Sequence, residues 1–128
     1  MHVQASVKQI PLDLSDFLNQ QSLKQLLLKR KSHHNFKKQP LNFKQISQLL
    51  WAAQGILPDG RRTAPSAGAL YSFKIFLSVA LPPERMNQGL YLFTPETEKL
   101  ELIFKGNFQK KLFEQALSQK CIIQAPVC

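Results

Sequence analysis

Residues 30–36, which read Arg-Lys-Ser-His-His-Asn-Phe, place a guanidinium, an ammonium and a hydroxyl close together after a stretch of helical periodicity. Arginine offers phosphate a planar fork of donors, lysine offers a point charge, and serine offers a hydroxyl donor. Alternate residues of an extended chain would therefore surround one phosphate monoester. The competing interpretation is a solvated basic helix end, which the helix dipole favours without any ligand.

Residues 63–71, which read Thr-Ala-Pro-Ser-Ala-Gly-Ala-Leu-Tyr, form a second segment with chemical potential. Small side chains let a backbone approach a flat ligand closely, and N–H groups at a helix start donate to carbonyl or anionic oxygens. The alternative is an ordinary helix start that packs against a neighbouring element. Taken alone, the segment favours neither interpretation.

The charge of the chain predicts an anionic partner. Seventeen Lys and Arg residues against eight Asp and Glu residues leave a formal charge of +9. No acid lies between Asp16 and Asp59, so the positive field is local. A phosphate cofactor, nucleic acid and a membrane surface all fit this charge, but the sequence has no nucleic-acid motif and its lysines are not interleaved with aromatic residues. We therefore expect no nucleic acid as partner.

Several other classes of site find little support in the sequence. Three histidines and two cysteines show no spacing typical of a zinc site or a disulfide framework, which favours a reducing, cytoplasmic setting. Ser66 lies in no Gly-x-Ser-x-Gly turn that would make it a nucleophile. No apolar run approaches the roughly 20 residues of a membrane span. We expect a cytoplasmic protein with no metal and no membrane partner.

Helices are predicted around both segments. Leucine and phenylalanine spacing in residues 12–31 indicates two short helices separated near residues 19–22, with Arg30 at the end of the second. Asn42 is a plausible N-cap for a helix with an apolar stripe from Phe43 to Ala53, and Gly55 is placed to end it at C′.

Strands follow the second segment. Alternation predicts a largely buried strand over residues 73–81, and a hairpin of residues 89–93 and 100–104 around the turn residues 94–96. A helix is predicted over 108–116, and a strand-like run begins at Cys121. We expect one α+β domain over residues 1–128, and the apolar ending at Cys128 predicts a truncated product.

The order of these segments resembles the nitroreductase superfamily, and within it the SagB-type dehydrogenases, which oxidise azolines to azoles in modified peptides. The resemblance rests on RKSHHNF, then PLNFKQISQLLWAAQGI, then RRTAPSAGALYSFKIFL, and covers about residues 26–93. It implies the FMN-dependent nitroreductase fold, a mixed or antiparallel sheet flanked by helices, with its C-terminal half missing here. It also implies a homodimer, and hydride transfer through flavin N5.

The resemblance assigns FMN-binding candidates position by position. The basic motif implies contacts of the phosphate and ribityl chain with Arg30, Lys31, Ser32 and His34, above the aromatic Phe36. The second motif lies along the flavin ring in the family, which implies roles for Pro65, Ser66, Ala67, Gly68 and, more weakly, Leu70.

Two departures from the family pattern affect function. His34 stands where the family has a third basic residue, and because an imidazole carries no permanent charge, this departure predicts weaker, pH-dependent phosphate affinity. The later region that carries the family's proposed general base is absent, so the catalytic residues stay unassigned. The alternative to an FMN-dependent oxidoreductase is a non-catalytic remnant or partner-binding fragment of such an enzyme.

Overall fold

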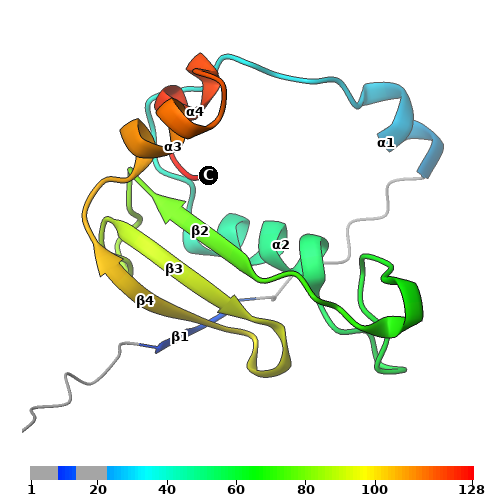
Figure 1. The fold of residues 1–128 in the computed structure, drawn as a ribbon. Helices are drawn as coiled ribbons and strands as arrows, with labels where there is room; N and C mark the ends of the chain where they lie inside the picture. The colour runs from blue at the N-terminus through cyan, green and yellow to red at the C-terminus, as the bar shows by residue number, and fades with distance from the viewer. Residues whose placement is uncertain (1–8, 14–22) are drawn as a thin grey trace, which may run out of the picture.

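The computed structural model describes residues 9–13 and 23–128. Its centre is a four-stranded antiparallel sheet in the order β1-β4-β3-β2 (Figure 1). The strands are β1 (Gln9–Pro11), β2 (Ile75–Val79), β3 (Gly89–Thr94) and β4 (Lys99–Lys105). The predicted hairpin is confirmed as β3 and β4, joined by the 3₁₀ turn η2 (Pro95–Thr97).

Four α-helices lie within the described residues: α1 (Leu23–Lys29), α2 (Phe43–Gln54), α3 (Gln109–Gln115) and α4 (Lys120–Gln124). The second helix predicted in residues 12–31 is confirmed as α1, while the first falls largely on residues 14–22, outside the described part. Figure 1 shows α1 set apart from the sheet, whereas α2 runs alongside it.

The two ends of α2 are defined by local chemistry. The Asn42 side chain accepts a hydrogen bond from the Gln45 N–H at 2.8 Å, and the Gln45 side chain accepts from the Asn42 N–H at 2.9 Å, which completes a capping box. Gly55 ends the helix as predicted, but at the C-cap and with extended backbone (φ −63°, ψ 154°). Glycine is needed there because a Cβ would lie 2.4 Å from Cδ1 of Trp51.

The core lies between α2 and one face of the sheet. Ile46 and Leu50 of α2 are buried against alternating residues of the strands, which are Leu77, Val79, Tyr91, Phe93 and Leu100. Tyr91 is fully buried, and its hydroxyl exchanges two 2.9 Å hydrogen bonds with the backbone of Asn87. The alternation predicted for β2 is confirmed at Leu77 and Val79, which are buried, but Ser78 between them is buried as well.

Two strand predictions need correction. The buried strand predicted over residues 73–81 is shorter, and Phe73, which precedes β2, is 86% exposed. The strand-like run from Cys121 to Ile123 is wrong, because these residues form α4, which packs on α3. Packing between helices here overrides the strand preference of two isoleucines.

Strand pairing near the C-terminus starts later than predicted. Val127 forms a bridge with Val79, and Ser78 and Cys128 exchange backbone hydrogen bonds of 2.7 and 2.9 Å along β2. At the opposite edge, β1 was missed by the sequence analysis, since its three residues contain only Ile10 as a buried apolar side chain. Its pairing partner, β4, lies about ninety positions away in the chain.

Candidate functional site

The loop of residues 63–71 has an unusual backbone. It contains the 3₁₀ turn η1 (Ala67–Ala69), and φ is positive at Gly68 (61°), Ala69 (53°) and Tyr71 (45°). Non-glycine residues adopt this region at a cost, so the surrounding contacts must stabilise it. Within the loop, the Tyr71 N–H donates to Oγ of Ser66 at 3.0 Å, and the Ala69 N–H donates to the Ser66 carbonyl at 3.0 Å.

The start of the loop is attached to the end of α2. The Thr63 hydroxyl donates to the Trp51 carbonyl at 3.0 Å, and the Thr63 N–H donates to the Gly55 carbonyl at 2.9 Å. Ile56 and Arg62 form an isolated antiparallel bridge. These bonds hold the start of the loop against the C-terminal end of α2.

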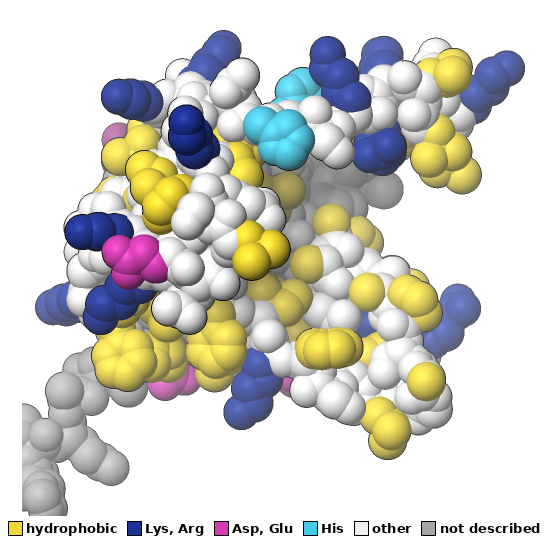
Figure 2. Space-filling model, turned by 45° about the horizontal axis from the view of Figure 1, so that its top comes forward, with side chains coloured by type: hydrophobic (Ala, Val, Ile, Leu, Met, Phe, Trp, Pro, Cys, Tyr) yellow, Lys and Arg dark blue, Asp and Glu magenta, His cyan; other side chains and the backbone are white. Residues whose placement is uncertain are grey.

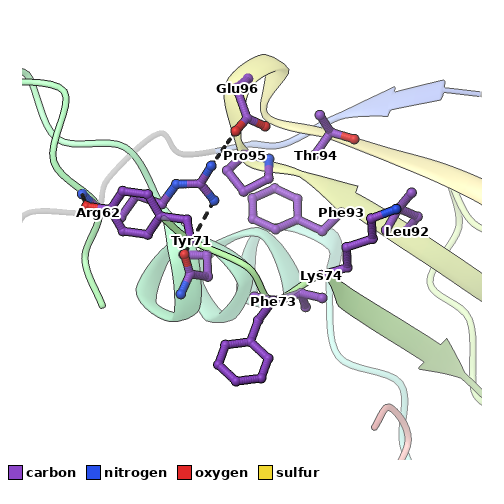
Figure 3. A pocket seen from close by; sticks show the side chains of 11 residues that line it. Arg62, Tyr71, Phe73, Lys74, Leu92, Phe93, Thr94, Pro95 and Glu96 are labelled. Atoms are coloured by element: carbon purple, nitrogen blue, oxygen red, sulfur yellow. Dashed lines mark hydrogen bonds and ion pairs between the residues drawn. The ribbon is translucent and has the colours of Figure 1, made fainter. Parts of the chain in front are cut away.

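Arg62 connects the loop to the β3–β4 hairpin (Figure 3). Its guanidinium forms an ion pair with the Glu96 carboxylate, donates to Oε1 of Gln54 at 3.4 Å, and lies with Cζ 4.6 Å from the centre of the Tyr71 ring. The Arg62 backbone N–H also donates to the Tyr71 hydroxyl at 3.4 Å. The Arg62 side chain is only 12% exposed, whereas the side chain of Glu96 is 57% exposed, so the ion pair is open to solvent on the carboxylate side.

Two cavities meet at Tyr71. One, of about 330 Å³, is lined by Gln54, Pro65, Ser66, Ala67, Leu70, Tyr71, Ser72 and Phe73. The other, of about 220 Å³, is shown in Figure 3 and includes Arg62, Lys74 and Glu96. Both share Gln54, Tyr71 and Phe73, and the first falls at the lower end of the usual size of ligand pockets, about 300–1,000 Å³.

The structure places four of the five residues proposed for the flavin ring around one cavity. Pro65, Ser66, Ala67 and Leu70 line the first cavity, and Leu70 is 77% exposed. Gly68 does not line it, and a Cβ added there would meet only the Leu70 side chain at 3.7 Å. Its glycine is explained by the positive φ rather than by a close approach.

The basic segment differs from this loop. Every residue from 30 to 36 is exposed, and among the described residues the side chains of Arg30, Lys31, Ser32 and His34 have no hydrogen bond or ion pair. Figure 2 shows Lys, Arg and His side chains gathered along the top of the molecule, where the chain runs from α1 through this segment toward α4. Phe36 is 42% exposed, so the structure does not pack it as a buried support.

The structure does not bring the two predicted halves into one cavity. His34 and Asn35 line a cavity of about 550 Å³ together with four residues near α4, which are Gln119, Lys120, Cys121 and Gln124. No cavity described above is lined by both residues 30–36 and residues 63–71. A basic residue from α4, Lys120, was not anticipated as a neighbour of His34.

Arg61 provides a contrast to Arg62. Its side chain bonds only locally, with Nε 2.7 Å from Oδ2 of Asp59, and both side chains are at least half exposed. That hydrogen bond lowers the pKa of Asp59, and the same contact raises the pKa of Arg61. Nothing in the sequence distinguishes the two neighbouring arginines or indicates that Arg62 reaches Glu96, 34 positions away.

Residues 9–13 and 23–128 contain no group of three or more His, Cys, Asp or Glu residues suited to a metal ion. None of the described helices has the length and apolar character needed to cross a membrane.

Comparisons with known proteins agree on one family. The sequence model of the nitroreductase family matches residues 27–127. A protein of Methanocaldococcus jannaschii named as a nitroreductase is 32% identical over 106 residues, which are 82% of this chain and 53% of that protein. The chain thus spans about half the length of the curated relative that it matches.

Solved structures show the same relationship. A crystal structure described as a nitroreductase from Ralstonia eutropha has a TM-score of 0.67 and 33% identity, over 78% of this chain and 45% of that one. A second, from Anabaena variabilis, has a TM-score of 0.61 over 77% of this chain and 21% of that one. At 22% identity, the second supports the fold alone.

Proposed function

Because the chain belongs to the nitroreductase family, we propose that it binds FMN non-covalently as part of a flavin-dependent oxidoreductase. The observation that carries the proposal is the braced loop of residues 63–71, which opens onto a cavity of about 330 Å³. Family membership supports a flavin in general terms, and the residues of this chain support FMN through the separate basic segment.

The loop suits the flat ring of a flavin. Pro65, Ala67 and Leu70 offer apolar surface, and the small residues between them leave the backbone accessible. Oγ of Ser66 accepts a hydrogen bond from Tyr71, which leaves its O–H proton available to a ligand oxygen. These groups would hold and orient the ring without changing the charge of the cavity.

The basic segment suits the phosphate. Arg30 and Lys31 are exposed cations without side-chain partners among the described residues, and Ser32 adds a hydroxyl donor. His34 completes the set and lies near Lys120 in a shared cavity. We assign the phosphate and ribityl chain to this segment and the ring to the loop of residues 63–71.

The reaction class follows from the cofactor. When bound, FMN supplies hydride transfer through its N5 atom, and the protein supplies binding and orientation. We propose a SagB-type azoline dehydrogenase acting on a peptide azoline in the cytoplasm, with a homodimer as the working unit. The proposal leaves the general base unassigned, because no residue of this chain has been matched to that role.

A titration with two flavins tests the proposal. Riboflavin has the ring but lacks the phosphate, so FMN is expected to bind more tightly, and added salt should weaken FMN binding more than riboflavin binding. Trp51 is the only tryptophan and bonds to the loop through its carbonyl, so its fluorescence is a suitable readout. Unchanged tryptophan and flavin fluorescence with FMN would contradict the proposal.

Turnover separates the finer proposal from the alternative. A non-catalytic, partner-binding fragment is favoured by the four exposed leucines of the α1 region, Leu23, Leu26, Leu27 and Leu28, which are 50–77% exposed. Oxidation of a reduced nicotinamide by the FMN-loaded protein would exclude that alternative. Aromatisation of an azoline peptide would support the SagB-type assignment, whereas nicotinamide oxidation without it would support a different nitroreductase activity.

A further inference from the structure

We propose that Arg62 is a positioning residue, which acts through Tyr71 to hold the wall of the ring-binding cavity in place. The inference rests on the proposed function, since the ligand of that cavity is taken to be a flavin. Arg62 itself lines the neighbouring cavity of about 220 Å³ and is absent from the lining of the larger one. Any effect of Arg62 on ring binding must therefore pass through another residue.

Tyr71 is the residue that transmits this effect. It lines both cavities, and its backbone adopts a φ of 45°, which a tyrosine rarely does. Three contacts restrain it: the guanidinium against its ring, the Arg62 N–H on its hydroxyl, and its own N–H on Oγ of Ser66. Two of these three contacts come from Arg62.

Glu96 and Gln54 hold Arg62 in turn. Glu96 lies in the η2 turn of the β3–β4 hairpin, and Gln54 is the last residue of α2. The guanidinium thus joins the loop to the C-terminal end of α2 and to the turn of the β3–β4 hairpin. Since planar guanidinium groups combine ion pairing with stacking on an aromatic ring, arginine is suited to this position in a way that lysine is not.

Glu96 provides the cleanest test, because its side chain is 57% exposed and lies outside the larger cavity, so that it can affect that cavity only through Arg62 and then Tyr71. We expect Glu96→Gln to weaken both FMN and riboflavin binding by about three- to fivefold, because a partly exposed ion pair contributes up to about 1 kcal/mol. Glu98→Gln is the matched control in the same turn, and Arg61→Met is the control for Arg62→Met. Both controls are expected to stay within about twofold of the unsubstituted protein.

The pattern among Arg62 variants distinguishes positioning from a general loss of structure. Arg62→Lys keeps a positive charge beside Glu96 but loses the planar stacking on Tyr71, so it should retain only part of the riboflavin affinity that Arg62→Met loses. Circular dichroism and thermal unfolding identify the temperature at which each variant is folded. The inference would be overturned if the three proteins bound riboflavin with equal affinity while all of them were folded. These are Glu96→Gln, Arg62→Met and the unsubstituted protein.

Hydrogen exchange keeps this test independent of the flavin. In the absence of ligand, amides of residues 66–71 are expected to exchange faster in Glu96→Gln than in Glu98→Gln, because the restraint on Tyr71 is weakened. If the unsubstituted protein binds neither flavin, the proposed function fails and exchange alone decides whether Arg62 fixes this wall. Equal exchange in the two variants would then count against Arg62 as a positioning residue.

Discussion

We propose that two segments of this chain bind one FMN molecule, and these segments differ in how their side chains are held. One is fixed by hydrogen bonds and an ion pair, and the other is exposed. The loop of residues 63–71 is fixed by bonds to α2, to the hairpin and within itself. The segment of residues 30–36 is exposed along its whole length, with no side-chain bonds from its four proposed phosphate ligands among the described residues. The difference matches the two parts of the ligand.

A flat ring is recognised by shape, and shape requires a wall that is in place before the ligand arrives. A phosphate group is recognised by charge, which acts over several ångströms and tolerates mobile donors. The comparison therefore predicts that substitutions in the loop affect stability and both flavins, whereas substitutions in the basic segment affect FMN alone.

The largest effect is expected at Gly55, where the loop meets α2. Gly55→Ala places a Cβ 2.4 Å from the Trp51 ring, so Trp51 or the backbone must move. Overpacking of this kind costs about 1–3 kcal/mol of unfolding free energy, measurable by urea denaturation. Ser32→Ala in the basic segment is the comparison, and it should change stability by less than about 0.5 kcal/mol. Equal stability of the two variants would remove the distinction between the segments.

Ser66→Ala is expected to have the next largest effect. It removes the acceptor of the Tyr71 N–H and the proposed donor to the ring. We expect a stability loss of about 1 kcal/mol and a similar weakening of riboflavin and FMN binding, measured by fluorescence titration. Loss of FMN affinity with riboflavin affinity unchanged would instead connect Ser66 with the phosphate.

The double variant Arg30→Ala and Lys31→Ala tests the other side of the comparison. It should leave the unfolding midpoint and riboflavin affinity unchanged, since neither side chain has a partner among the described residues. FMN affinity should fall about fivefold at low ionic strength and less in high salt. Lys37→Ala with Lys38→Ala removes the same charge just beyond the segment, and an equal effect there would indicate a diffuse positive field.

The smallest effect is expected for His34→Arg, which restores the third basic residue of the family pattern. A guanidinium offers a permanent charge and a planar fork to phosphate, so FMN should bind about two- to threefold more tightly. Riboflavin binding should not change. His33→Arg, one position earlier in the exposed segment, is the control, and an equal gain from it would show that only net charge matters.

Several elements could be predicted from the sequence because local chemistry defines them. The capping box of Asn42 and Gln45 and the apolar stripe indicated α2, and alternation with a turn indicated the β3–β4 hairpin. The elements that were missed or wrongly predicted depend instead on contacts with other elements. A strand at β1 depends on pairing with β4, and the helical state of residues 120–124 depends on packing against α3.

The candidate site was also predicted only in part: its cavity-lining residues were named from the sequence, but the residue that holds the loop was not. The resemblance to the family proposed Pro65, Ser66, Ala67, Gly68 and Leu70, and the structure places all of these except Gly68 around one cavity. Nothing in the sequence indicated that Arg62 rather than Arg61 would hold the loop, because the two are neighbours of the same type. The choice depends on Glu96, whose carboxylate reaches Arg62 across the cavity beside Tyr71.

The sequence by itself determined the family, the helix α2 and the hairpin, because these depend on residue type, short spacing and order. The resemblance to the family also led us to propose which side chains would bind a phosphate or line a flavin ring. Only the tertiary structure decided which of those side chains are braced and which are exposed. Bracing comes from contacts such as that of Arg62 with Glu96, which are distant in the chain and close only after the sheet has formed. Such contacts leave no periodic pattern in the sequence, since their formation depends on the packing of whole elements.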